Sequence, residues 1–241
     1  MYLSEYRGRG VRVAVIDSGV FAEHPHVGRV EDGVAIREDG SLDTDVADSL
    51  GHGTAVTAAI LEKVPDAAIV PIKVFWTKLA TSAASLVRGI DEACARGAHV
   101  INLSLGTSNA GHRALLETAV ERARVGGAII VAASGDDVGV VWLPGSLGGV
   151  VSVRLDWTCP RDAYRVDTVN GRTLVAASGY PRDIPHVPRE RNLKGISFAV
   201  ANATGFVARA REASPRADAA DTLAILAGGL SNTVDRTTAE P

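Results

Sequence analysis

Short apolar runs alternate with amphipathic stretches along most of the chain. The runs are rich in valine, isoleucine and alanine and lie at residues 11–16, 70–75, 99–104, 128–133 and 150–153. A run of this length without alternating polar positions is typical of a strand that is buried on both faces of a parallel sheet. The pattern therefore predicts five strands in the interior of one sheet.

The stretches between these runs have the spacing of amphipathic helices. Helices are predicted at residues 52–63, 82–96, 110–125 and 197–212. Pro65 and Gly97 are expected to end the first two. Ser214-Pro215 has the residues of an N-cap and a first helical position, so a last helix is expected from there to Gly228-Gly229. The polar tail from Ser231 is expected to be loose.

The alternation of strands and helices determines the fold class. Asn170-Gly171, between the β-prone segments 163–168 and 173–177, predicts a hairpin. The rest of the pattern predicts an α/β fold with a mostly parallel central sheet and helices on both faces, in three layers. The length suits a single domain over residues 1–241.

Composition excludes several classes of function. A formal net charge of −3 and the lack of a Lys/Arg run give no basis for nucleic-acid binding. No apolar stretch approaches the ~18 residues that cross a bilayer, and residues 1–10 lack a signal-peptide core. Cys94 and Cys159 form no disulfide framework and are expected to be buried thiols. The expectation is a cytoplasmic globular protein.

Three residues with reactive side chains stand where a strand ends or a helix begins. Asp17 follows the first buried strand, His52 opens a helix, and Ser197 begins a later one. Each alone is typical of a turn or cap residue. Together they supply the hydroxyl nucleophile, the imidazole base and the orienting carboxylate of acyl transfer. The carboxyl ends of parallel strands are also where α/β sheets bind ligands.

The segments around these residues resemble the motifs of the subtilisin-like (subtilase) family. The matching blocks are Asp17-Ser18-Gly19-Val20, His52-Gly53-Thr54 and Gly195-Ile196-Ser197-Phe198-Ala199, in the family's order. The resemblance implies a serine endopeptidase of peptide or protein substrates, with Asp17, His52 and Ser197 as the catalytic triad. It also implies that no cofactor is needed.

Two further blocks resemble the family's substrate-binding segments. Ser104-Leu105-Gly106 would pair by backbone hydrogen bonds with an extended peptide. Ala133, Ser134 and Gly135 resemble one wall of the S1 pocket, which receives the P1 side chain of the substrate. Trp142 falls near the floor of that pocket, where subtilisins keep a glycine. If it points inward, P1 must be small; the alternative is a tryptophan packed in the core.

One departure from the family affects the oxyanion hole, which the resemblance assigns to position 136 and to the N–H of Ser197. The family has an asparagine where this chain has Asp136. An ionised carboxylate only accepts hydrogen bonds, and losing that amide donor in a subtilisin costs about 2.7–4 kcal/mol. Three alternatives follow from this departure. Asp136 is neutral and donates as the amide would, or another group donates in a slower enzyme. In the third alternative the protein is a pseudoprotease that only binds peptides.

Other expectations rest on what the sequence lacks. The acidic stretch 43–48 suggests calcium, which many family members bind, but it lacks the spacing of a calcium loop and favours a solvated loop. Met1 leads directly into the catalytic segment, which favours a cytosolic enzyme that folds without a propeptide. Such an enzyme suits restricted processing, such as trimming a leader from a precursor peptide. A non-proteolytic acyl hydrolase has less support because Ser104-Leu105-Gly106 is suited to peptides.

Overall fold

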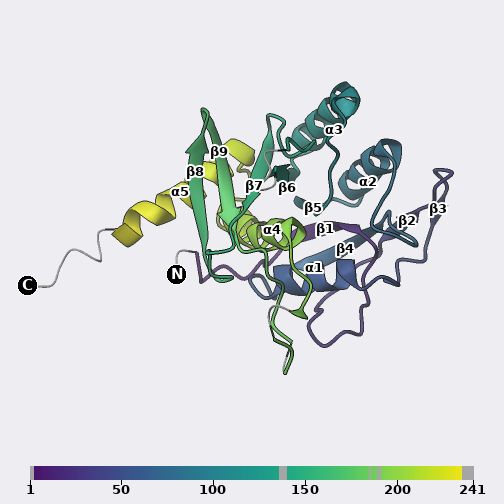
Figure 1. Cartoon of the computed structure of the whole chain (residues 1–241), viewed down its shortest axis with the longest axis horizontal. Helices are drawn as coiled ribbons and strands as arrows, with labels where there is room; N and C mark the ends of the chain where they lie inside the picture. The colour runs from purple at the N-terminus through teal and green to yellow at the C-terminus, as the bar shows by residue number, and fades with distance from the viewer. Residues whose placement is uncertain (1–2, 136–139, 185, 189–190, 235–241) are drawn as a thin grey trace, which may run out of the picture.

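The structure is a computed structural model, and it describes residues 3–135, 140–184, 186–188 and 191–234. In these residues a nine-stranded sheet has the order β3-β2-β4-β1-β5-β6-β7-β9-β8 (Figure 1). Its strands are β1 (Arg12–Asp17), β2 (Val34–Ile36), β3 (Leu42–Asp43), β4 (Ala68–Lys73), β5 (Val100–Leu103), β6 (Ile129–Gly135), β7 (Val150–Leu155), β8 (Tyr164–Val169) and β9 (Arg172–Ala177). Neighbouring strands are parallel except at the edges, where β3 and β8 run antiparallel to β2 and β9. The predicted hairpin is β8–β9.

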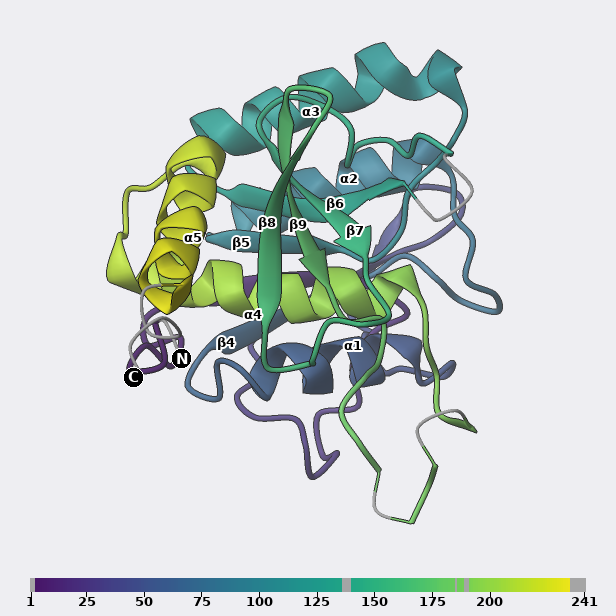
Figure 2. The same cartoon turned by 60° about the vertical axis from the view of Figure 1, so that its left-hand side comes forward.

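Helices cover both faces of the sheet (Figure 2). One face carries α1 (His52–Leu61), α4 (Ile196–Ala213) and α5 (Ala219–Val234), and the other carries α2 (Ala83–Ala95) and α3 (Arg113–Val125), which the 3₁₀ turn η1 (Ala110–His112) precedes. Val13 and Val15 of β1 face α1 and α4, whereas Ala14 and Ile16 face α2. The predicted three-layer α/β fold is confirmed.

Helix α4 runs through the centre of its layer. Phe198 and Phe206 are almost completely buried between this helix and its neighbours. Burial of each such side chain contributes about 1.5–3 kcal/mol. The first turn of α4, which carries Ser197, is therefore fixed by packing against the core.

Strand register aligns the predicted functional segments along one edge. Ile16 of β1 pairs with Leu103 of β5, and Leu103 pairs with Ala132 of β6. The residues that follow are Asp17, Ser104 and Ala133, so these three stand side by side at the carboxyl ends of adjacent parallel strands.

The prediction for the last helix was wrong at both ends. Ser214 ends α4, and the side chain of Asp218 caps α5 by accepting from the N–H groups of the residues two and three positions later. The helix continues through Gly228-Gly229 to Val234. Each glycine costs only about 1 kcal/mol in a helix, and the burial of Leu226 against the sheet offsets that cost. Among the described residues, no helix has both the length and the apolar character to cross a membrane.

Candidate active site

The side chains of Asp17 and His52 meet at the carboxyl edge of the sheet. Asp17 ends β1 and is fully buried, and His52 opens α1 with 12% of its side chain exposed. His52 Nδ1 lies 2.8 Å from Oδ1 and 3.0 Å from Oδ2 of Asp17. A carboxylate in this position accepts from Nδ1–H, so Nε2 is left as the proton acceptor of the ring.

A close approach of α1 to the end of β1 makes this contact possible. A Cβ added at Gly53 would lie 2.2 Å from the carbonyl oxygen of Gly19. The N–H of Gly53 donates to Ser18 Oγ at 2.9 Å, and the N–H of Ser18 donates to Asp17 Oδ1 at 2.7 Å. Because only glycine fits at position 53, this residue sets the distance between the helix of His52 and Asp17.

Opposing effects act on the pKa of His52. Burial lowers it because it disfavours the charged imidazolium, while the hydrogen bond to Asp17 and the charges of Asp17 and Asp48 raise it. The result is a pKa above the ordinary value of 6.5. The two carboxylates therefore stabilise the protonated ring, which is the state that a general base reaches when it takes a proton.

Ser197 is the second residue of α4, and Gly195 lets the chain turn into that helix. Gly195 has a φ of 146° and a ψ of −174°, a conformation open almost only to glycine. The N–H groups in the first turn of a helix have no partner within the helix. Since Ser197 lies in that turn, its N–H is available at the positive end of the helix dipole, where an oxyanion is stabilised.

The hydroxyl of Ser197 points to β5 rather than to His52. Ser197 Oγ donates to the carbonyl oxygen of Ser104 at 3.1 Å, and Ser104 Oγ donates to the carbonyl oxygen of Ser197 at 3.1 Å. In the described part of the chain no hydrogen bond joins Ser197 to His52, although the rings of His52 and Phe198 lie 5.8 Å apart. Rotation about the Ser197 Cα–Cβ bond would break the hydrogen bond to Ser104 and free the hydroxyl. A hydrogen bond between a nucleophile and its base often forms fully only when substrate binds.

A buried polar network lies beneath this contact and was not predicted from the sequence. Asn102 and Thr204 are fully buried. Asn102 Nδ2 donates to Ser104 Oγ at 2.9 Å, and Thr204 Oγ1 donates to Asn102 Oδ1 at 3.0 Å. The signal in the sequence was a single amide inside an apolar strand, because a buried amide needs partners. The network ties β5 to α4 and thereby Ser104 to Ser197.

One segment predicted to bind substrate, Ser104–Gly106, follows β5, and the other, Ala133–Gly135, forms the end of β6. Residues 141–143 lie between them, since Thr107 and Leu143 exchange backbone hydrogen bonds of 2.9 and 2.8 Å and the N–H of Trp142 donates to Ser134 O at 3.3 Å. Three of the predicted substrate-binding stretches thus converge on one place. Asp136, the predicted oxyanion-hole residue, lies outside the described residues.

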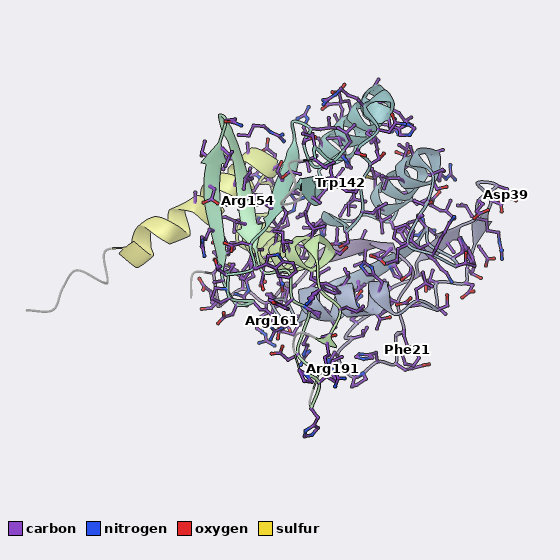
Figure 3. The ribbon with its side chains drawn as sticks, in the orientation of Figure 1. Phe21, Asp39, Trp142, Arg154, Arg161 and Arg191 are labelled. Atoms are coloured by element: carbon purple, nitrogen blue, oxygen red, sulfur yellow. The ribbon has the colours of Figure 1, made fainter. Side chains whose placement is uncertain are left out.

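Trp142 packs against the segment predicted to bind the substrate backbone. Its half-buried side chain packs on Gly106, where an added Cβ would lie 3.3 Å from the ring. Figure 3 places Trp142 well apart from Phe21 and Arg191. The tryptophan therefore contacts the Ser104–Gly106 segment directly.

The three aspartates of the acidic stretch contact different partners. Asp43 pairs with Arg37, Asp45 lies 3.7 Å from Lys73, and Asp48 accepts from the backbone at the start of α1. Calcium needs about six to eight oxygens around one point. Within the ranges that the structure describes, no three His, Cys, Asp or Glu side chains are grouped to hold a metal ion.

The strand order, the helices on both faces and the polar side chains at the carboxyl edge define an α/β fold of the subtilisin type. The chain belongs to the subtilase family, whose model matches residues 8–238.

Sequence similarity to individual proteases supports this family assignment. The chain is 31% identical over 207 residues to a thermostable alkaline protease of Halalkalibacterium halodurans, covering 75% of this chain and 55% of the relative. The chain thus spans about half the length of the curated relatives it matches first.

Two solved structures share the fold. A cold-adapted subtilisin-like serine proteinase superposes with a TM-score of 0.72 at 21% identity, over 93% of this chain and 84% of its own. A lanthipeptide protease gives 0.66 at 20% identity, over 91% and 80%. At these identities the likeness concerns the fold.

Proposed function

We propose that this protein is a serine endopeptidase in which Asp17, His52 and Ser197 form the catalytic triad. The observation that carries the proposal is the 2.8 Å contact between His52 Nδ1 and Asp17, with Ser197 at the start of the helix that packs Phe198 against the same imidazole. Membership of the subtilase family supports it.

The reaction proceeds through an acyl-enzyme. Ser197 Oγ forms a bond to the peptide carbonyl carbon while His52 Nε2 takes the hydroxyl proton, and Asp17 holds the ring and stabilises the imidazolium. The C–N bond then breaks, and His52 returns the proton to the leaving amine. Water attacks the ester by the same route, which releases the acid and restores Ser197.

Charge on the carbonyl oxygen is stabilised by the N–H of Ser197 and, in our proposal, by Asp136. A neutral carboxyl group can donate as an amide does, whereas an ionised one cannot. Carboxyl pKa values rise by several units in apolar surroundings, so a donating aspartic acid is chemically reasonable. The rate would then fall as Asp136 ionises.

Peptide substrates bind as an extended strand beside Ser104–Gly106, because backbone groups at a strand edge recognise a peptide of any sequence. The packing of Trp142 on Gly106 favours a shallow S1 pocket and a small P1 residue. We propose restricted cleavage of a precursor peptide rather than bulk digestion; a protease named for lanthipeptides has the same fold.

A fluorophosphonate probe tests the activity, because it reacts only with an activated serine hydroxyl. Intact mass should show one adduct, located on Ser197 by peptide mapping and missing in Ser197→Ala. Cleavage of a mixed peptide library should be lost in the same variant. Peptide binding without labelling or cleavage would instead identify a peptide-binding pseudoprotease.

A further inference from the structure

The carboxylate of Asp48 is saturated with hydrogen bonds at the start of α1. Oδ1 accepts from the N–H groups of Leu50 and Gly51 at 3.0 and 2.8 Å, and Oδ2 accepts from the N–H and hydroxyl of Thr54 at 2.9 and 2.6 Å. The N-cap residue, Gly51, has no side chain to do this. Asp48 therefore fixes the first turn of the helix whose first residue is His52.

Asp48 is also connected to Asp17, through Ser18. Ser18 Oγ donates to Asp48 Oδ1 at 2.8 Å and accepts the N–H of Gly53 at 2.9 Å. The N–H of the same serine donates to Asp17 at 2.7 Å. A continuous set of hydrogen bonds thus runs from Asp48 through Ser18 to Asp17 and to the residue after His52.

The charge of Asp48 acts on His52 in the same sense as that of Asp17. Both carboxylates favour the imidazolium, Asp17 from β1 and Asp48 from the loop before α1. On its outer side, Asp48 lines a pocket with His24, His26 and Arg182. These are the titratable groups that share this pocket with Asp48; the two histidines come from the loop after β1 and Arg182 comes from the segment before α4.

We propose that Asp48 is a positioning residue for the reaction, which holds His52 in register with Asp17 and whose negative charge favours the transition state in which His52 is protonated. This rests on the proposed function. A helix cap with only a structural role would contribute stability and leave the titration of His52 unchanged, so the two roles predict different results.

The first test measures the His52 titration by NMR in the inactive Ser197→Ala protein, with the signal assigned by its loss in His52→Gln. Asp48→Asn keeps the shape and one acceptor but removes the charge, so the midpoint should fall by about half a pH unit or more. Asp45→Asn is the matched control, since it removes a charge from the same loop without touching α1. An unchanged midpoint in Asp48→Asn overturns the proposal, and this readout needs no activity.

The second test uses the active protein after the fluorophosphonate assay has established Ser197 as the nucleophile. In Asp48→Asn, the acid limb of kcat/KM should move to lower pH and kcat should fall about tenfold with little change in KM, since an interaction made in the transition state is lost. Asp48→Glu keeps the charge but displaces the hydrogen bonds, so its acid limb should stay while kcat falls. If Asp48→Asn does not fold, the kcat of Asp48→Glu tests the proposal in its place. An unchanged kcat in the variant that folds overturns the proposal.

Discussion

Ser197 and Ser104 exchange hydrogen bonds, each hydroxyl donating to the other residue's carbonyl oxygen at 3.1 Å. The exchange joins the first turn of α4 to the end of β5 across 93 residues of sequence. Because Ser104 also belongs to the segment proposed to bind the peptide, the position of the nucleophile and the position of the substrate strand are set by one contact.

Ser104→Ala should weaken both stability and activity. It removes the donor to Ser197 O and leaves Asn102 Nδ2 without its acceptor, which costs about 1–3 kcal/mol for a buried group. Urea unfolding measures the loss, and kcat should fall with it because the start of α4 loosens. Thr118→Ala, whose hydroxyl makes one exposed bond within α3, should be close to neutral. Equal effects of the two changes would contradict this role for Ser104.

Activity should depend on pH through His52. The base must be neutral to accept a proton, and its pKa is raised above 6.5, so kcat/KM should rise with a midpoint above that value. The same shift makes a stability prediction of defined sign. Protonated His52 stabilises the fold fully below its unfolded pKa, and this stabilisation is lost as pH rises through the folded pKa. Unfolding of Ser197→Ala with and without His52→Gln, at several pH values, measures it; a midpoint below 6.5 would refute both statements.

Gly53→Ala should separate the helix of His52 from Asp17. The new Cβ would overlap the carbonyl oxygen of Gly19, a backbone atom that cannot rotate away, so we expect a loss of about 1–3 kcal/mol and a steep fall in kcat. Gly148→Ala is the control, because an added Cβ there meets no atom within 4 Å. If Gly53→Ala had the melting temperature and the kcat of the wild-type protein, α1 would have room to shift away from Gly19, and this prediction would be wrong.

Replacement of Trp142 should widen the preference at P1. With the tryptophan in place, peptides with small P1 residues should be cleaved best, and Trp142→Gly should raise kcat/KM for Phe or Leu at P1 at least about tenfold relative to Ala. Trp157→Ala, at a tryptophan that is 42% exposed, should leave the preference unchanged. Strong cleavage after Phe or Leu by the wild-type protein would rule out the shallow pocket.

Asp136→Asn should raise the rate at neutral pH. An amide donates to the oxyanion at every pH, whereas a carboxyl group donates only when it is protonated, so the gain should grow as pH rises and shrink in acid. Parallel pH profiles of kcat for the two proteins measure this. A rate that is unchanged or lower would argue that another group completes the oxyanion hole.

The positions of the central strands could be predicted from the sequence. Valine-rich and isoleucine-rich runs bury both faces of a strand, so β1, β5 and β6 were predicted within one or two residues. Helix ends were less predictable. The cap at Asp218 is local, with hydrogen bonds that reach only two and three residues along the chain, and Ser214-Pro215 was an equally suitable start by its residue types. The passage of α5 through Gly228-Gly229 depends instead on what α5 packs against, which local residue preferences do not contain.

The sequence by itself determined the α/β fold class and the strand ends and helix starts that carry Asp17, His52 and Ser197, because these follow from periodicity and local motifs. Only the tertiary structure decided their partners. Ser197 bonds to Ser104, and Asp48 is tied to Asp17 through Ser18, because the strand register and the close approach at Gly53 bring together residues far apart in the chain. Hydrogen bonds form between atoms that packing has already placed within about 3 Å, and no local pattern encodes that distance.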